Sequence, residues 1–419
     1  MRSTHARLSA FAFTSALTFA SACTSDQLVA PSTLEKPSAP SATIVGGGIQ
    51  RYVAIGTSIS AGVQSDGLFF ATQAASWPAQ LAGAAGIAFN QPLIASPGCR
   101  SPILAPLILG LRLSGESALT PAASLSCAPL LGGVTLPVDN VSLNGALTKD
   151  ALLTTAQNIT DAGNAQIYAR VLEFGQTQVS TMIERNPQLV SVELGSNEVL
   201  EASSGVAIPG VTLFPFSAWA PLYHSVLDNV QAVTRRAVVV GLIDDIRHVP
   251  AFRTGDELWA DRAEFAAFHV AVSANCHYNQ NLIFVPILVT TTVASGLQAL
   301  QQSLPPVPLS CAAGGLGVED FILTPLEQLV VNLQMQSMSA QIRLEALGRG
   351  FAYFPLGALY DRSDVKGPFS VTTLMLGNSP FGPYFSNDGL HPSALGQTVL
   401  AKAAAQALNN RFGLGIVIP

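Results

Sequence analysis

From residue 51 onward, the hydrophobic and polar positions of the chain follow two alternating patterns. Short runs of consecutive apolar, often β-branched residues are typical of strands buried on both faces of a parallel sheet. They predict strands at 51–55, 189–194, 237–243 and 351–356. Longer stretches between them have helical periodicity, at 76–86, 164–186, 220–236, 256–281, 326–348 and 393–410. Strands that alternate with helices in this way predict an α/β fold with a parallel sheet covered on both faces.

Two stretches interrupt this alternation. Residues 93–138 are rich in Pro, Gly and Leu and carry Cys99 and Cys127, and residues 288–321 are rich in Pro, Gly and Thr and carry Cys311. Loops of this length in a compact domain are usually functional or disordered. The cysteines favour ordered insertions that leave the sheet, each held by a disulfide.

The N-terminal residues have the pattern of an export signal. Arg2 and Arg7 precede an apolar, small-residue segment that ends in an A-x-A pattern at Ala20 and Ala22, which is typical of a secretory signal peptide. The segment is short and rich in small residues, so it does not indicate a membrane span. We therefore expect cleavage after Ala22.

Such a cleavage makes residues 1–22 the signal peptide and Cys23 the first residue of the mature chain. This order resembles a bacterial lipoprotein signal, in which the cysteine carries a lipid anchor. Those signals usually have leucine where this chain has alanine three residues before the cysteine, so ordinary secretory cleavage is the alternative. Residues 23–50 are dominated by Pro, Ser, Thr and Gly, which predicts a flexible tether. Residues 51–419 then form the folded domain.

Four cysteines remain when Cys23 is set aside, namely Cys99, Cys127, Cys276 and Cys311. An even number in an exported chain indicates two disulfides, for which three pairings exist. The sequence-local pairs, first with second and third with fourth, would close loops of about thirty residues and contribute roughly 3.5–4 kcal/mol each on the chain-entropy model. Four buried free thiols are the alternative.

Composition and charge narrow the classes of function. The chain has 419 residues, of which 49% are hydrophobic and 11% charged, and its formal net charge is −6 without any cluster of Lys or Arg. Nucleic-acid binding needs a basic face, so we expect no nucleic-acid partner. The spacings Cys-x-x-Cys and His-x-x-x-His are absent, so we expect no zinc site. We expect a monomer that needs no metal and no organic cofactor.

Four short motifs contain side chains suited to acyl transfer. Ser58 follows the first predicted strand in "GTSIS", where it could be a nucleophile or a helix cap. Asp388 lies three residues before His391 in "DGLH", so its carboxylate can accept from the imidazole and hold its tautomer; such pairs also occur in surface turns. Asn197 in "LGSNE" could donate to an oxyanion or cap a helix, and Gly145 in "NVSLNGA" could direct a backbone N–H into a crevice or merely form a turn.

Taken together and in this order, the four motifs resemble the four blocks of the SGNH/GDSL hydrolase family. The resemblance spans residues 56–391. It implies a nucleophile at Ser58, an Asp388–His391 pair that completes a Ser-His-Asp triad, and an oxyanion hole formed by Ser58, Gly145 and Asn197. It also implies a flavodoxin-like, three-layer α/β/α sandwich with a central parallel sheet of about five strands. The G-x-S-x-G motif of other serine hydrolases is absent.

The chain departs from the family pattern at two positions. Thr57 stands where the first block usually has aspartate, and Glu198 stands where the third block often has aspartate. The family aspartate before the nucleophile is not the carboxylate of the triad, and threonine can also form a local hydrogen bond.

We therefore expect an exported carboxylic ester hydrolase, lipid-anchored at Cys23 in the cell envelope or secreted, that acts on acyl or lipid-like esters through an acyl-enzyme. The apolar residues of the two insertions favour such substrates. A glycan O-deacetylase is an alternative within the same chemistry. A surface lipoprotein that keeps the fold without effective catalysis is the alternative from another class.

Overall fold

The computed structural model of the protein describes residues 48–419. The expected signal peptide (1–22), Cys23 and the tether as far as residue 47 lie outside the described residues. Within the described part, no helix combines the length and the hydropathy required to cross a bilayer.

A parallel sheet of four strands forms the centre of this part of the chain. Its strands are adjacent in the order β1 (Tyr52–Gly56), β2 (Leu189–Glu193), β3 (Ala237–Gly241) and β9 (Ala352–Pro355). Every residue of β1, β2 and β3 is buried, which explains why β1 and β3 are continuous apolar runs. In β2, the polar residues Ser191 and Glu193 are buried as well. The four predicted strands are thus confirmed.

An extended segment beside β1 takes the place of a fifth strand. The N–H of Ala54 donates to the carbonyl of Asp139 at 2.9 Å, and the carbonyls of Ala54 and Gly56 accept from Val141 and Leu143 at 2.9 and 3.0 Å. With this segment included, the order across the sheet is segment 139–143, β1, β2, β3, β9. If the five are numbered by their position in the chain, this order is 2-1-3-4-5. That is the flavodoxin-like order.

The expectation of about five strands is therefore corrected to four strands and one short edge segment. The segment pairs with β1 only as an isolated bridge, between Ala54 and Asn140. Pro137 precedes the segment and has no N–H to donate to a ladder. Gly145 follows it with a φ of +72°, which is not an extended conformation, so the pairing with β1 ends there.

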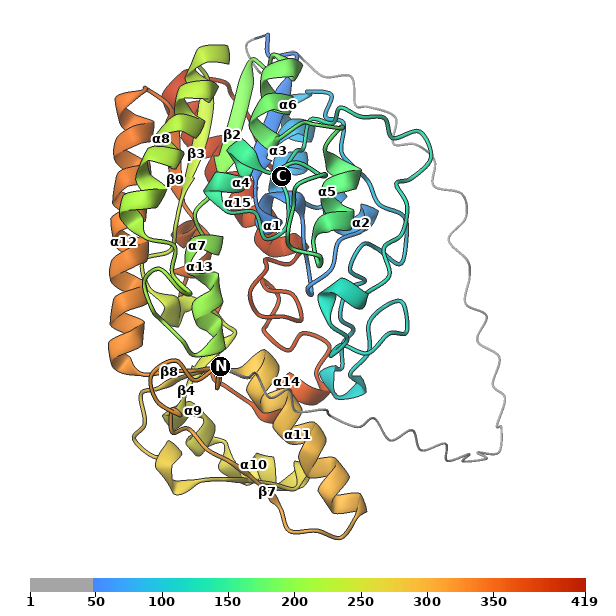
Figure 1. Cartoon of the computed structure of the whole chain (residues 1–419), viewed down its shortest axis with the longest axis vertical. Coiled ribbons are helices and arrows are strands. Elements are labelled where there is room, and N and C mark those ends of the chain that lie inside the picture. The colour runs from blue at the N-terminus through green and yellow to red at the C-terminus, as the bar shows by residue number, and fades with distance from the viewer. Residues whose placement is uncertain (1–47) are drawn as a thin grey trace, which may run out of the picture. The chain divides into compact units, whose positions relative to one another are not determined.

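Two groups of helices cover the sheet (Figure 1). The first group consists of α6, α8 and α12. Helix α6 contacts β1, helix α12 contacts β3 and β9, and helix α8 packs against both α6 and α12. In the second group, α3 contacts α15, and α15 contacts β3 and β9. The bounds of these helices are α3 Trp77–Ala85, α6 Gln178–Arg185, α8 Phe216–Val233, α12 Pro325–Gly348 and α15 Ala394–Phe412.

The remaining strands and helices are short, apart from helix α11, which has 17 residues. Three antiparallel strands form a small sheet in the order β4-β6-β8, and β5 pairs in parallel with β7. Their bounds are β4 Phe252–Thr254, β5 Val270–Val272, β6 Leu282–Phe284, β7 Val307–Leu309 and β8 Ile322–Leu323. The other helices are α1 Ser58–Ala61, α2 Phe70–Ala74, α4 Thr148–Leu153, α5 Ala165–Val171, α7 Asn197–Leu200, α9 Gly255–Ala260, α10 Arg262–Phe265, α11 Val285–Gln301, α13 Gly357–Tyr360 and α14 Val371–Leu376.

Two of the predicted helices are interrupted. The stretch 164–186 is divided into α5 and α6, because Gly175 has a φ of +75° and Thr177 caps a new helix by accepting from the N–H of Ser180 at 3.1 Å. The stretch 256–281 contains α9 and α10 but also β5, since its residues 270–272 pair with β7. Tertiary pairing overrides the local helical pattern there.

The first part of the second predicted insertion, 288–321, is helical. It begins inside α11, where the hydroxyls of Thr290, Thr291 and Thr292 each donate to the carbonyl four residues earlier, at 2.6–2.7 Å. These bonds satisfy the threonine side chains within the helix, while Val289 and Val293 are buried. The first insertion, 93–138, does lack long elements and contains only two 3-10 turns, η1 Leu107–Leu109 and η2 Ala122–Ser124.

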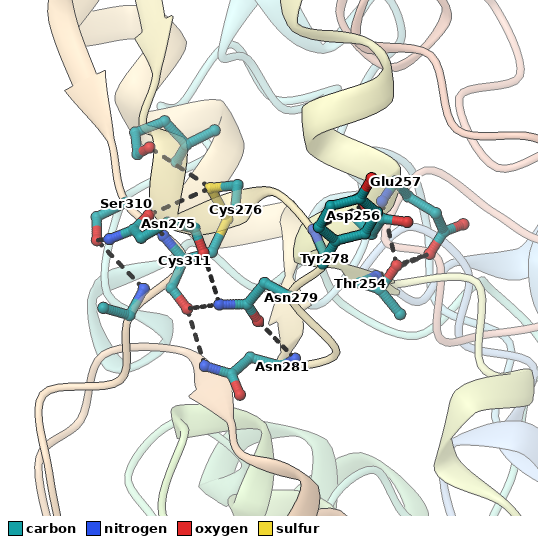
Figure 2. The surroundings of a disulfide bond; sticks show 12 residues. Thr254, Asp256, Glu257, Asn275, Cys276, Tyr278, Asn279, Asn281, Ser310 and Cys311 are labelled. Carbon is teal, nitrogen blue, oxygen red and sulfur yellow. Dashed lines mark hydrogen bonds between the residues drawn. A yellow bond between two sulfur atoms is a disulfide. The ribbon is translucent and has the colours of Figure 1, made fainter.

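The two disulfides are the sequence-local ones, Cys99–Cys127 and Cys276–Cys311. The first joins the two arms of the insertion 93–138. The second ties the segment after α10 to the end of β7, and Figure 2 shows the side chains around it. There Asn279 and Asn281 donate to the carbonyl of Cys311 at 3.3 and 2.9 Å. Two disulfides are compatible with an exported protein.

Candidate active site

The predicted site residues lie at the carboxyl ends of the central strands. Ser58 begins α1, two residues after the end of β1, and Asn197 begins α7 after β2. In a sheet of this order, the carboxyl ends of β1 and β2 lie at the topological switch point, where open α/β sheets bind ligands. Asp388 and His391 reach this point from the turn that precedes α15.

A chain of hydrogen bonds joins three of the predicted residues. Nε2 of His391 lies 2.9 Å from Oγ of Ser58, and Nδ1 of His391 lies 2.7 Å from Oδ2 of Asp388. Ser58 is 5% exposed and Asp388 is 6% exposed. A hydroxyl, an imidazole and a carboxylate therefore lie in the order and at the distances that proton transfer from serine to histidine requires.

The Asp388 carboxylate is held by several donors. Oδ1 accepts from the N–H groups of Leu390 and His391, both at 2.9 Å, and from the hydroxyl of Ser386 at 3.1 Å. Oδ2 also accepts from the N–H of Asp66 at 2.6 Å. Burial alone would raise the pKa of Asp388, but the charge of His391 and the hydrogen bonds from His391 and Leu390 lower this pKa to about 2. The carboxylate is therefore ionised at neutral pH.

The same pairing acts on His391 in the opposite direction. Burial alone would lower the pKa of the imidazole, but the charge and the hydrogen bond of Asp388 raise the pKa above its usual value of 6.5. A raised pKa makes the ring a stronger proton acceptor.

A turn at Ser65 and Asp66, which no sequence motif indicates, supports the Asp388 carboxylate. Both residues have positive φ, 53° and 54°. The side chain of Asp66 pairs with Arg100 at 3.1 Å and with Arg112 at 2.6 Å, and both arginines belong to the insertion 93–138. The insertion therefore fixes the turn whose N–H donates to the carboxylate.

Glu193, the last residue of β2, is a second feature of the site that no sequence motif indicates. Its Oε2 accepts from the N–H of Thr57 at 3.1 Å and from the N–H and hydroxyl of Ser60 at 3.2 and 3.0 Å. The hydroxyl of Thr57 donates to both carboxylate oxygens at 2.9 Å. Burial raises the pKa of Glu193, although these hydrogen bonds oppose the shift. The carboxylate thus fixes the residues on either side of Ser58, and Thr57 does form the expected local hydrogen bonds.

Glu198 is also buried, which its position in the third motif did not indicate. One carboxylate oxygen accepts from the N–H of Thr148 at 2.6 Å, and the other has no hydrogen-bond partner within the described residues. Burial raises the pKa of Glu198. The carboxyl anchors α7, which carries Asn197, to the start of α4.

The three residues expected to form an oxyanion hole are brought together in part. Ser58 and Asn197 line the same cavity. The amide of Asn197 donates one hydrogen to the carbonyl of Ala146 at 2.8 Å, so its second hydrogen remains for another acceptor. The N–H of Ser58 is at the first position of α1 and has no acceptor within that helix. Gly145 lines a neighbouring polar cavity that Asn197 also borders.

Gly145 is required by the local backbone. Its φ is +72°, and a Cβ at this position would lie 2.5 Å from Nδ2 of Asn164. Asn164 is fixed in turn, because its Oδ1 accepts from Asn144 at 2.9 Å and from Arg100 at 2.8 Å. The turn at Gly145 is therefore rigidly attached to the insertion 93–138.

An apolar cavity of about 100 Å³ adjoins the hydroxyl of Ser58. Besides Ser58, Asn197 and His391, its walls are mainly aliphatic and aromatic side chains, among them Ile246, Val249, Phe252, Met335, Leu356 and Leu390. A cavity with such walls suits a short apolar group next to the serine.

Other histidines lack this arrangement. His248 pairs with Asp361 at 2.7 Å, but both side chains are exposed and no serine lies on the other ring nitrogen. His224 pairs with Glu345 and Asp228 at the surface. Among residues 48–419, no group of three or more His, Cys, Asp or Glu side chains is placed to hold a metal ion.

No protein-family model and no curated protein matches the chain. Solved structures align with 86–87% of it at low similarity. Phospholipase A1 from Streptomyces albidoflavus NA297 is 15% identical with a TM-score of 0.36, and 99% of that chain is covered. An acetylxylan esterase from Geobacillus stearothermophilus is 11% identical with a TM-score of 0.36 and 96% covered. An extracellular lipase from Streptomyces rimosus is 14% identical with a TM-score of 0.32 and 99% covered. At these scores the likeness is not in itself evidence for the chemistry of this chain.

Proposed function

We propose that the protein is a serine-dependent carboxylic ester hydrolase of the SGNH type. The observation that carries the proposal is the chain of hydrogen bonds from Ser58 through His391 to Asp388, at 2.9 and 2.7 Å. It lies at the switch point of the sheet and beside an apolar cavity.

In the first half of the reaction, Oγ of Ser58 attacks the ester carbonyl carbon as Nε2 of His391 accepts the hydroxyl proton. Asp388 keeps the proton of the imidazole on Nδ1 and stabilises the imidazolium. The tetrahedral intermediate collapses when its C–O bond to the alcohol breaks and Nε2 returns the proton to that oxygen. The acyl group is then covalently attached to Ser58.

In the second half, a water molecule replaces the alcohol. His391 removes its proton as the water oxygen attacks the acyl carbon, and it then returns the proton to Oγ of Ser58 as the carboxylic acid leaves. The enzyme ends in its starting state, and the reaction requires no oxidant, reductant or cofactor.

The developing oxyanion requires donors on the side of Ser58 away from His391. The proposed set of donors is the N–H of Ser58, the second amide hydrogen of Asn197, which lines the same cavity as Ser58, and the N–H of Gly145. One donor of this kind typically lowers the barrier by about 2.7–4 kcal/mol.

The apolar cavity beside Ser58 supports an acyl ester as the substrate. Because its volume is about 100 Å³, below the roughly 300 Å³ at which ligand pockets usually begin, it favours a short acyl group over a long one.

The two disulfides are compatible with an exported location, and we propose that the enzyme works in the cell envelope, anchored at Cys23, or after secretion.

The proposal is tested by hydrolysis of p-nitrophenyl butyrate by the purified protein and its variants. We expect Ser58→Ala and His391→Ala each to lower kcat at least a thousandfold, and the double variant to be little worse, because the two groups act as a unit. His248→Ala provides a matched control, since it removes a histidine that also pairs with an aspartate but has no serine partner, and it should leave kcat unchanged.

Circular dichroism and thermal unfolding would establish that each variant is folded. If folded wild-type protein hydrolyses no ester, or if Ser58→Ala keeps more than a few per cent of the activity, the proposed function is wrong. The first of these outcomes would favour a binding protein with the same fold.

A further inference from the structure

A second apolar cavity, of about 310 Å³, borders His391. Leu390 and His391 line both this cavity and the smaller one beside Ser58, whereas Ser58 lines only the smaller one. The two cavities therefore share Leu390 and His391, and the larger one borders the imidazole but not Ser58.

Most residues that line the larger cavity belong to the insertion 93–138 or to α11, which runs into the insertion 288–321. Helix α11 contributes Ile287, Thr291 and Leu297, and the turn η1 contributes Leu107 and Ile108. The turn η1 contacts α11 as well as α14, and α11 is labelled in Figure 1. Neither α11 nor η1 belongs to the central sheet or to the helices that cover it, so the cavity is an addition to the flavodoxin-like core.

The charged groups at the cavity already have partners. Asp66 pairs with Arg112 at 2.6 Å, and Asp388 pairs with His391 at 2.7 Å. Arg112 is only 3% exposed and also donates to the carbonyl of Ser101 at 2.8 Å. The remaining walls are largely aliphatic. A ligand that enters would contact apolar side chains, and a charged or sugar-like ligand would find few free hydrogen-bonding groups.

The chemistry of the proposed reaction decides which part of an ester lies there. His391 returns its proton to the oxygen of the leaving alcohol, so that oxygen must lie within hydrogen-bond distance of Nε2. The acyl carbon must lie at Ser58, next to the smaller cavity. The alcohol oxygen therefore lies beside Ser58 at Nε2, and its alkyl chain would pass Leu390 and His391, the two residues that the cavities share, to enter the larger cavity.

We infer that the larger cavity is a binding site for an apolar alkyl chain on the alcohol side of the ester. This inference rests on the proposed function and names its substrate class, namely an ester of a short acyl group with a long-chain, apolar alcohol portion. The cavity volume of about 310 Å³ falls within the range of small-molecule pockets. Each additional methylene group that is buried should raise affinity about fourfold, so affinity should rise steeply with the length of the alcohol.

The test measures kcat/KM for methyl, butyl and hexyl butyrate, in which the acyl group is constant. We expect a rise of at least tenfold from methyl to hexyl in the wild-type protein. Thr291→Trp fills the cavity from α11 and should remove this rise while leaving methyl butyrate within about threefold of wild type. Ser295→Trp is the matched control, because Ser295 is an exposed residue one turn further along the same helix, and it should preserve the rise.

Each other outcome has a defined meaning. If methyl butyrate is hydrolysed but hexyl butyrate is no better, the alkyl site is wrong and the proposed function stands. If the rise persists in folded Thr291→Trp, or disappears equally in Ser295→Trp, the alkyl chain does not bind in this cavity. A preference for butyrate esters of glycerol or of a sugar over hexyl butyrate would also overturn the inference. If no ester is hydrolysed at all, both the proposed function and the inference fail.

Discussion

At the scale of single residues, the pairing of His391 with Asp388 is the feature that determines the proposed chemistry. The Asp388 carboxylate, whose pKa is about 2, stays ionised at every pH at which hydrolysis would be assayed. It raises the pKa of the imidazole, with a smaller contribution in the same direction from Asp66 and an opposing one from Arg100. The reaction needs a neutral imidazole as its base, so protonation of His391 stops it.

This pairing predicts the pH dependence of hydrolysis. In the wild-type protein, kcat/KM should fall on the acid side with a midpoint above pH 6.5, because the pKa of His391 is raised. Asp388→Asn removes the group that raises this pKa, so the midpoint should move to lower pH, and kcat should fall by about 10³–10⁴-fold through loss of the correct tautomer. Stopped assays from pH 5 to pH 9 would measure both effects. A wild-type midpoint below pH 6 would contradict the proposed role of the pair.

At the scale of elements, β2 and α1 are joined through Glu193, which explains why this chain can have threonine before the serine. In the usual family pattern the position is an aspartate. Here a carboxylate at position 57 would face the buried carboxylate of Glu193, whose oxygens already accept from Thr57 at 2.9 Å. Two buried carboxylates at this distance cannot both ionise.

We therefore predict that Thr57→Asp destabilises the protein. The free energy of unfolding should fall by about 1–3 kcal/mol. The loss should be larger at pH 8 than at pH 5, because a carboxyl whose pKa is raised in the folded state loses its contribution to stability as the pH rises. Thr57→Asp combined with Glu193→Gln should recover most of the loss, since the amide can donate to the new carboxylate. Thr57→Ser is the conservative control.

Urea denaturation at the two pH values would measure these differences, and hydrolysis of p-nitrophenyl butyrate would show the effect on the α1 turn. Equal stability of Thr57→Asp and wild type at pH 8 would mean that the two side chains do not share one buried site. The same conclusion would follow if Glu193→Gln gave no recovery in the double variant.

The elements also show what the sequence could and could not predict. Strands β1, β2, β3 and β9 and helices α3, α8, α12 and α15 were predicted, because burial on both faces or on one helical face gives a strong periodic pattern. Helix α11 was not predicted, since its threonines are poor helix formers and only side-chain bonds to the preceding turn and packing of Val289 and Val293 stabilise it.

The candidate site could be predicted only where residue types are distinctive. Ser58, Asn197, Asp388 and His391 occur in short motifs whose order is informative. Glu193 looked like the end of an apolar strand, and the Asp66 turn acts through a backbone N–H, which no side-chain pattern encodes. Contacts of this kind join residues more than a hundred positions apart, so only the fold shows them.

At the scale of the whole molecule, the two disulfides have different relations to the site. Cys99 precedes Arg100, which pairs with Asp66 at 3.1 Å, and the N–H of Asp66 donates to the Asp388 carboxylate. The Cys276–Cys311 bond instead holds β7 and the segment after α10, and its surrounding hydrogen bonds are local (Figure 2). Only the first is connected to the proposed triad.

We predict that the two disulfides differ in their effect on activity but not on stability. Replacing either pair by serines should lower the free energy of unfolding by roughly 3.5–4 kcal/mol on the chain-entropy model. Loss of Cys99–Cys127 should also lower kcat on methyl butyrate by about tenfold, equivalent to 1.4 kcal/mol in the barrier, whereas loss of Cys276–Cys311 should leave kcat within about twofold. Equal losses of kcat in the two folded variants would contradict the connection through Arg100 and Asp66.

The identity of the nucleophile is the central claim, and covalent labelling tests it most directly. The measurement is peptide mass spectrometry after reaction of the purified protein with diisopropyl fluorophosphate, which phosphorylates activated serines with release of fluoride. We predict a single adduct on Ser58, at normal rate in His248→Ala, at least a hundredfold slower in His391→Ala, and absent in Ser58→Ala. An adduct on another serine, or labelling of Ser58 at the same rate without His391, would contradict the account.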